Sequence, residues 1–77
     1  MSKHYPQMNV EEMEKVEPGD AVWQEDYGWL TVLDTSLPAT KKGSEVVERS
    51  AVVQTEKAKL ALLLVGKYNC EISVVAL

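Results

Sequence analysis

Cysteine and histidine are scarce in this chain of 77 residues, which contains one of each. Cys70 has no second cysteine with which it could form an internal disulfide. A structural zinc site needs about four cysteine or histidine ligands, so Cys70 and His4 predict no metal site. A single core in a chain below about 80 residues supplies little stability. Disulfides and metal sites are thus excluded as sources of additional stability. Association with another copy of the chain is the remaining source that the sequence favours.

Catalytic patterns are missing as well. Cys70 is the candidate nucleophile, but it precedes a run of isoleucine and valine, where a cysteine is usually a small core residue. Adjacent carboxylates, as in Glu25 and Asp26, point apart on a strand or helix and make a poor acid–base pair. The four glycines are isolated from one another, so no phosphate-binding loop is present. We expect no catalytic residue and no cofactor.

Long apolar runs and positive charge are also limited. The longest uninterrupted apolar stretch, residues 60–65, is far shorter than the roughly 20 residues of a membrane span. The N-terminus lacks the apolar region of a secretory signal, so we expect a cytoplasmic protein. The net charge is −4, and residues 1–34 carry eight acidic against two basic residues. This charge balance disfavours a nucleic acid as the binding partner. The acidic residues could attract a basic partner, or they could simply keep the protein soluble.

The composition, 45% hydrophobic and 26% charged, is that of a folded domain. We predict a flexible arm over residues 1–8 and a single domain over residues 9–77. Asn9 and Glu12 have the spacing of a capping box, which predicts a helix over residues 10–16 before Pro18 and Gly19.

The rest of the chain predicts strands. Residues 21–24 and 29–33 indicate a hairpin around a turn at 25–28, and residues 34–43 read as a loop. The valine pairs of residues 45–55 favour a strand with a bulge or a bend near Arg49 and Ser50. Residues 57–65 fit a strand or a helix, of which we favour the strand, and residues 70–77 form the last strand.

The predicted fold is α+β and mainly β: a short N-terminal helix, then about five antiparallel strands in a small SH3-like barrel or a strongly bent sheet. Residues 16–23 are similar to the opening strand of many SH3-like barrels, in which a Gly-Asp turn leads into an apolar strand. The likeness covers about eight residues, and no functional residue carries over from it.

Aromatic residues around the predicted hairpin turn are the main candidates for binding. Trp23 and Trp29 are symmetric about the turn and should lie on one face, where packing into the core is their ordinary role. Tyr27, at the turn itself, should be exposed. Tryptophan and tyrosine are also enriched at binding hot spots. We therefore nominate Glu25, Asp26, Tyr27 and Trp29 as a partner-binding surface.

An alternative ligand site combines Tyr27 and Trp29 with Lys41 and Lys42. Aromatic stacking and lysine charge would suit a nucleotide-like anion held in pockets between subunits. Solvated lysines on a loop are the ordinary alternative.

Within the possible strand over residues 57–65, residues 60–65 would be apolar on both faces, and each face needs cover. We therefore expect one face of this strand, or the edge of the last one, to be buried against another subunit. The candidate interface residues are Leu63, Val65, Val74, Val75 and Leu77.

The sequence thus favours a non-catalytic binding module: a small accessory or inhibitor protein that occupies a partner protein's surface as a homo-oligomer. Compact acidic chains of this size are typical of accessory proteins, including small viral ones. The alternative is an oligomer that binds or sequesters a small ligand.

Overall fold

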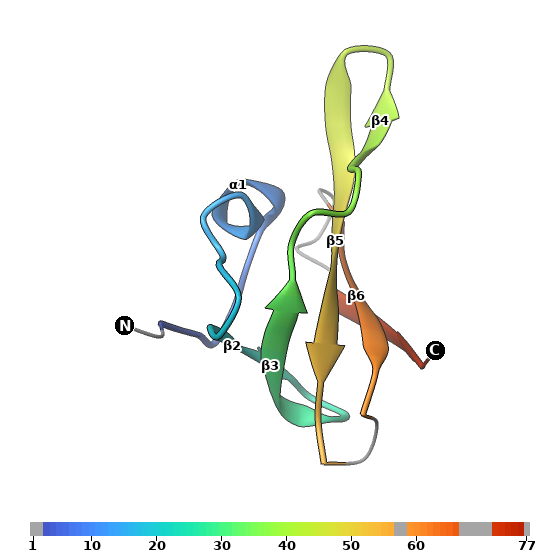
Figure 1. The fold of residues 1–77 in the computed structure, drawn as a ribbon. Coiled ribbons are helices and arrows are strands. Elements are labelled where there is room, and N and C mark those ends of the chain that lie inside the picture. Colours follow the sequence, from blue (N-terminus) through green and yellow to red (C-terminus); the bar gives the residue numbers. More distant parts are fainter. Residues whose placement is uncertain (1–2, 57–58, 67–71, 77) are drawn as a thin grey trace.

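A computed structural model describes residues 3–56, 59–66 and 72–76, and these ranges are mainly β (Figure 1). The elements are β1 (His4–Tyr5), α1 (Val10–Met13), β2 (Ala21–Gln24), β3 (Gly28–Asp34), β4 (Thr40–Lys42), β5 (Glu45–Gln54), β6 (Ala61–Gly66) and β7 (Ile72–Ala76). They form a seven-stranded sheet in the order β1-β2-β3-β5-β6-β7, with β4 paired to β5.

The sheet is mixed and open, so the prediction of purely antiparallel strands is wrong, as is the closed barrel, the first of the two predicted forms. β1 runs parallel to β2, and the other pairings are antiparallel. β1 and β7 lie at opposite ends of the strand order, and no pairing joins them in the part of the chain that the structure describes. Seven strands appear instead of five because β1 falls in the predicted arm and β4 in the predicted loop.

The start of α1 confirms the predicted cap. The Asn9 side-chain Oδ1 accepts a hydrogen bond of 2.8 Å from the backbone N–H of Glu12. The helix ends at Met13, earlier than predicted, and the chain continues in tighter turns in which Val16 N–H donates to the Met13 carbonyl at 3.4 Å. These turns still deliver Val16 to the core.

The core lies on one face of the sheet, beneath α1 and the segments beside it. Strand alternation selects this face: in β6, Ala61, Leu63 and Val65 have no exposed surface, whereas Leu62 and Leu64 point to the other face and are half-buried. The cluster comprises Met8, Met13, Val16, Val22, Leu30, Val32, Ala51, Val53, Ala61, Leu63 and Val65. We call the opposite side of the sheet the outer face.

The N-terminal segment is part of the domain from at least β1 onward, whereas the sequence predicts an arm through residue 8. Met8 is buried, and the backbone N–H of Ala21 donates to the Lys3 carbonyl at 2.9 Å. The buried carboxylate of Asp20 fastens this segment, because it accepts hydrogen bonds from the backbone N–H groups of Lys3 (3.0 Å) and Glu17 (2.9 Å). These two bonds hold the pKa of Asp20 below its ordinary value, against the opposing effect of burial.

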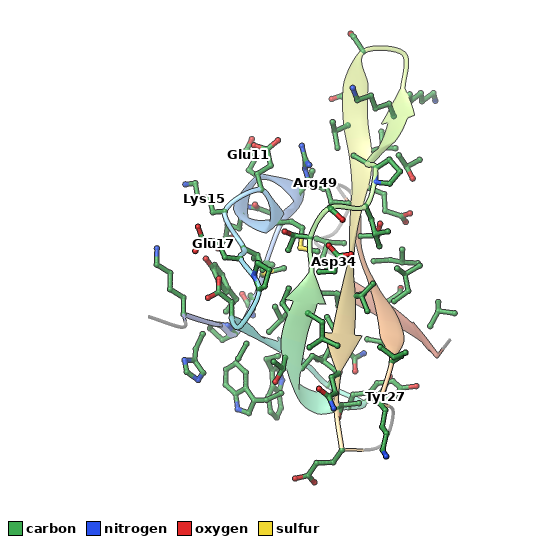
Figure 2. All side chains as sticks on the ribbon, viewed as in Figure 1. Glu11, Lys15, Glu17, Tyr27, Asp34 and Arg49 are labelled. Carbon is green, nitrogen blue, oxygen red and sulfur yellow. The ribbon has the colours of Figure 1, made fainter. Side chains whose placement is uncertain are left out.

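The strands deviate from regular pairing at two positions, one of which lies in β5 two residues before the predicted Arg49. β5 is continuous through Arg49 and Ser50, and its register with β6 is regular there. One extra residue lies in β3, at Leu33 between Val32 and Asp34, and the other lies in β5 itself, at Val47 opposite the step from Thr40 to Lys41 of β4. Arg49 forms an ion pair with Glu14, immediately after the helix, and Figure 2 shows Arg49 beside α1.

Candidate functional site

Trp23 and Trp29 face each other across the β2–β3 hairpin on the outer face. They are register partners, and their ring centroids are 5.4 Å apart with the planes at 70°. Trp23 is 42% exposed and Trp29 is 47% exposed. The expectation that they fill the core is wrong, because their neighbours Val22 and Leu30 take the core positions of the same strands.

His4 extends this aromatic group from β1. Its ring centroid lies 5.3 Å from that of Trp29 with the planes at 84°, an edge-to-face contact. The parallel pairing of His4 with Ala21 places the ring on the same side of the sheet. We call the exposed group of His4, Trp23 and Trp29 the tryptophan face.

An acidic turn borders the tryptophan face. The side-chain Oε1 of Gln24 accepts hydrogen bonds from the backbone N–H groups of Asp26 (2.7 Å) and Tyr27 (2.9 Å), which fixes the turn. Gly28 closes it with φ of +77°, a conformation that disfavours other residues. Glu25 and Asp26 are exposed, as a partner-binding role requires.

Tyr27 behaves opposite to the tryptophans. The sequence predicts that it is exposed, but it is half-buried and packs against the core cluster. Its carbonyl also accepts a hydrogen bond of 3.4 Å from the Thr55 hydroxyl. Tyr27 therefore anchors the turn to the core and to Thr55. The aromatic side chains that are open to a partner are those of Trp23 and Trp29.

A groove of about 360 Å³ lies on the β5 side of Trp29. Its lining residues are Trp29, Thr31, Gln54, Thr55 and Glu56. The register explains this set: Thr31 pairs with Gln54, so continuing the antiparallel ladder by two residues brings Glu56 opposite Trp29. The sequence alone could not assign Gln54, Thr55 and Glu56 to this site, because their pairing with β3 is not local.

Lys41 and Lys42 are remote from the tryptophan face within one copy, so the alternative ligand site stays a prediction for a pocket between subunits. Lys41 pairs with Val46 near the start of β5, whereas Tyr27 is bonded to Thr55 just beyond its end. Nine residues of extended chain span about 30 Å at 3.3 Å each. Figure 1 shows the β4–β5 hairpin projecting from one end of the sheet, and Figure 2 labels Tyr27 at the other. Within one copy, a nucleotide cannot contact both groups.

The candidate oligomer residues divide among three environments. Leu63 and Val65 are fully buried in the chain's own core, so the expectation that they contact another subunit is wrong. Val74 is partly buried and packs against that core, whereas Val75 is 49% exposed on the outer face. Leu77 lies outside the described residues, as does the candidate nucleophile Cys70.

Residues 3–56, 59–66 and 72–76 contain no cluster of three or more histidine, cysteine or acidic side chains suited to hold a metal ion. Over the same residues, the helical content is too short to provide a span through a lipid bilayer. Comparisons with protein-family models, curated proteins and solved structures found no match for this chain.

Proposed function

We propose that this protein is a non-catalytic binding module of the accessory or inhibitor type, which occupies the surface of a partner protein with its tryptophan face and acts as a homo-oligomer. The observation that carries the proposal is the exposure of two tryptophans, in contact with each other, on a sheet face that nothing covers within the described residues. Burial of such rings against a partner yields a large contact area at a low cost in side-chain entropy.

The charge around the tryptophan face supports a basic partner. Glu25 and Asp26 lie exposed on the adjoining turn, and Glu56 lines the groove beside Trp29. Exposed charges at the rim of an interface contribute mainly to the rate of association and to the choice of partner. A positively charged partner surface would meet the apolar rings at the centre and the carboxylates at the border.

The edge of β7 supports assembly with a second copy. β7 pairs with β6 on one side, and no described strand pairs with its other side. Its sequence from Ile72 to Ala76 has no charged residue and no proline, the devices with which proteins usually protect a free edge. An uncharged strand is also suited to pair with its own copy, because two-fold symmetry would place any charge close to its equivalent.

Antiparallel pairing of two β7 strands would join the sheets of two copies into one. Centred on Val74, this pairing would place the exposed Val75 beside Ser73 of the second copy on the outer face. β7 and β2 are separated by three strands in the sheet order, so both tryptophan faces would stay accessible. Two such sites on one dimer would strengthen binding to a partner that has two matching sites.

Binding is tested by comparing the wild type with Trp23→Ala and Trp29→Ala in quantitative affinity capture, followed by measurement of Kd with the purified partner. We expect each variant to weaken binding by at least tenfold. Thr40→Ala on β4, far from the tryptophan face, is the matched control and should bind like the wild type. Equal binding by the wild type and both tryptophan variants would place the contact elsewhere and reject the proposal.

Assembly is tested by native mass spectrometry and light scattering of the purified protein. We expect a dimer that Ser73→Lys/Val75→Lys converts to a folded monomer, because the introduced lysines would gather across the two-fold axis. Thr40→Lys/Ser44→Lys adds the same charge at exposed sites on the β4–β5 hairpin and should leave the dimer intact. A wild-type monomer at micromolar concentration would contradict the dimer.

A further inference from the structure

We infer that the groove beside Trp29 receives an arginine side chain of the protein partner, with the guanidinium stacked on the indole and paired with Glu56. This inference rests on the proposed function and specifies its chemistry. The groove within one copy differs from the anion site expected between subunits, because a carboxylate lines the groove and the Lys41–Lys42 pair lies at the other end of the sheet.

The indole of Trp29 supplies a flat apolar wall. Trp23 and His4 contact this ring from the β2 and β1 side of the sheet. The groove lies on the β5 side, because its other lining residues, apart from Thr31 of β3, belong to the end of β5 and the residues that follow it. Contacts with Trp23 and His4 therefore hold the ring in place while part of it stays open to the groove. Cations are attracted to the faces of aromatic rings, most strongly to that of tryptophan.

The other lining groups offer hydrogen-bond acceptors. Glu56 contributes a carboxylate, Gln54 an amide oxygen, and Thr31 and Thr55 hydroxyl oxygens. The Thr55 hydroxyl donates its proton to the Tyr27 carbonyl, so its oxygen is left to accept. A guanidinium carries five N–H donors in one plane and has no acceptor, which complements this set.

The surrounding charge favours a cation over a neutral group. Glu56 is exposed at the end of β5, and Glu25 and Asp26 are exposed on the neighbouring turn, which the bond between Thr55 and Tyr27 ties to β5. Lys59 is the nearest described cation in sequence, and it does not line the groove. A positive side chain would thus meet a carboxylate inside the groove and two more near its rim.

The size and shape of the groove favour one side chain, and arginine over lysine. About 360 Å³ is at the small end of the range for ligand sites, roughly 300–1,000 Å³. The ammonium of lysine is a compact, strongly hydrated charge, whereas guanidinium is planar, less hydrated and able to stack and to pair with a carboxylate at once. The groove provides both of these contacts, on Trp29 and on Glu56.

The test uses three blocked pentapeptides that differ only at the central residue among glycines: arginine, its neutral planar analogue citrulline, or lysine. Binding to the ¹⁵N-labelled protein is followed by NMR at low and at physiological salt. We expect the arginine peptide to shift the Trp29 indole signal and the amides of Thr31, Thr55 and Glu56. Citrulline should bind at least fivefold more weakly, lysine should fall between the two, and added salt should weaken the arginine peptide.

Two protein variants locate the contact. Glu56→Gln removes the charge from an exposed position that folding does not require, and should lower the affinity for the arginine peptide at least threefold without changing that for citrulline. Trp29→Ala should abolish binding of both the arginine and the citrulline peptide. Thermal unfolding will show whether this variant is folded. Glu11→Gln removes an exposed charge from the far side of the sheet and should have no effect.

Equal binding of arginine and citrulline peptides, or an unchanged affinity in Glu56→Gln, would overturn the inference. That outcome would leave the proposed function standing if Trp23→Ala still reduces capture of the partner protein, because the tryptophan face would then act without the groove. If the arginine peptide binds as expected but capture is independent of both tryptophans, the groove is an arginine site and the proposed function fails.

Discussion

The two faces of the sheet are both apolar, but they have different roles. In β6, Leu63 on the core face has no exposed surface, whereas its neighbour Leu62 on the outer face is half-buried. In the hairpin, Leu30 is fully buried and the adjacent Trp29 is 47% exposed. The difference arises because α1 and the N-terminal segment cover one face, and no described element covers the other. Apolar character therefore identifies both faces of this sheet as surfaces that can be buried. The position of α1 decides which of the two faces is buried within the chain.

The strongest test of this contrast is a pair of neighbouring leucines. Leu63→Ala removes a fully buried side chain and should cost about 2–5 kcal/mol in the free energy of unfolding, enough to unfold much of so small a domain. Leu62→Ala should cost about 1 kcal/mol or less, because its side chain is already partly solvated. Urea denaturation followed by circular dichroism measures both. Equal losses would mean that the outer face is as fully covered as the core.

Substitution of Asp20 tests how the N-terminal segment, which helps to cover the core face, is attached to the sheet. Asp20→Asn weakens two hydrogen bonds to a buried carboxylate and should cost about 2–3 kcal/mol. Glu17→Gln is the control, because the Glu17 side chain is exposed and its hydrogen bonds to Asp20 are made by its backbone N–H and carbonyl. A loss of the same size in Glu17→Gln would contradict a specific role for the Asp20 carboxylate.

The pH dependence follows from the same carboxylate. The pKa of Asp20 is lower in the folded chain than in the unfolded one, so its contribution to stability is present above the unfolded value of about 3.9 and is lost as pH falls through the folded value. Asp34 acts in the same direction, because hydrogen bonds from Ser36 lower its pKa. Between pH 7 and pH 3, we expect the free energy of unfolding to fall more in the wild type than in Asp20→Asn. An identical fall in both would assign the acid sensitivity to other groups.

A smaller effect is expected at the cap of α1. Asn9→Ala leaves the Glu12 N–H without its partner and should cost about 1 kcal/mol, whereas Asn9→Ser should retain most of the stability. Differential scanning calorimetry can resolve this difference. If Asn9→Ala melts like the wild type, the cap contributes little to the closure of the core face.

The smallest effect is expected on the outer face at Leu33. This residue is 40% exposed and lies at the register shift of β3, so Leu33→Thr should change the free energy of unfolding by less than about 0.5 kcal/mol. Thermal unfolding at low protein concentration checks the value. A loss above 1 kcal/mol would show that this part of the outer face is covered.

Local signals in the sequence predict several elements well. The Asn9 cap, the 21–24 strand and the pairing of the two tryptophans are confirmed, because each depends on residues a few positions apart. The strand preference for residues 57–65 is confirmed for residues 61–65, whereas Lys59 and Leu60 precede β6. Alternation over such short distances needs no knowledge of the remaining fold.

Features that depend on distant residues could not be read in this way. The position of α1 decides which aromatic side chains face the core, those of Trp23 and Trp29 or that of Tyr27. No local pattern in the sequence encodes this position. β1 is two residues long and depends on Asp20 and Lys3 for its attachment. The groove needs the register between β3 and β5, which ten residues of intervening chain, including β4, separate.

The β4–β5 hairpin offers a practical site for engineering. Its tip at Gly43 and Ser44 is exposed, Gly43 has φ of +66°, and the hairpin projects from the end of the sheet opposite the turn between β2 and β3 (Figure 1). Exposed loop tips with small residues tolerate insertions best. A fluorescent or affinity label inserted here would report on binding at the tryptophan face and on pairing of β7 without touching either surface.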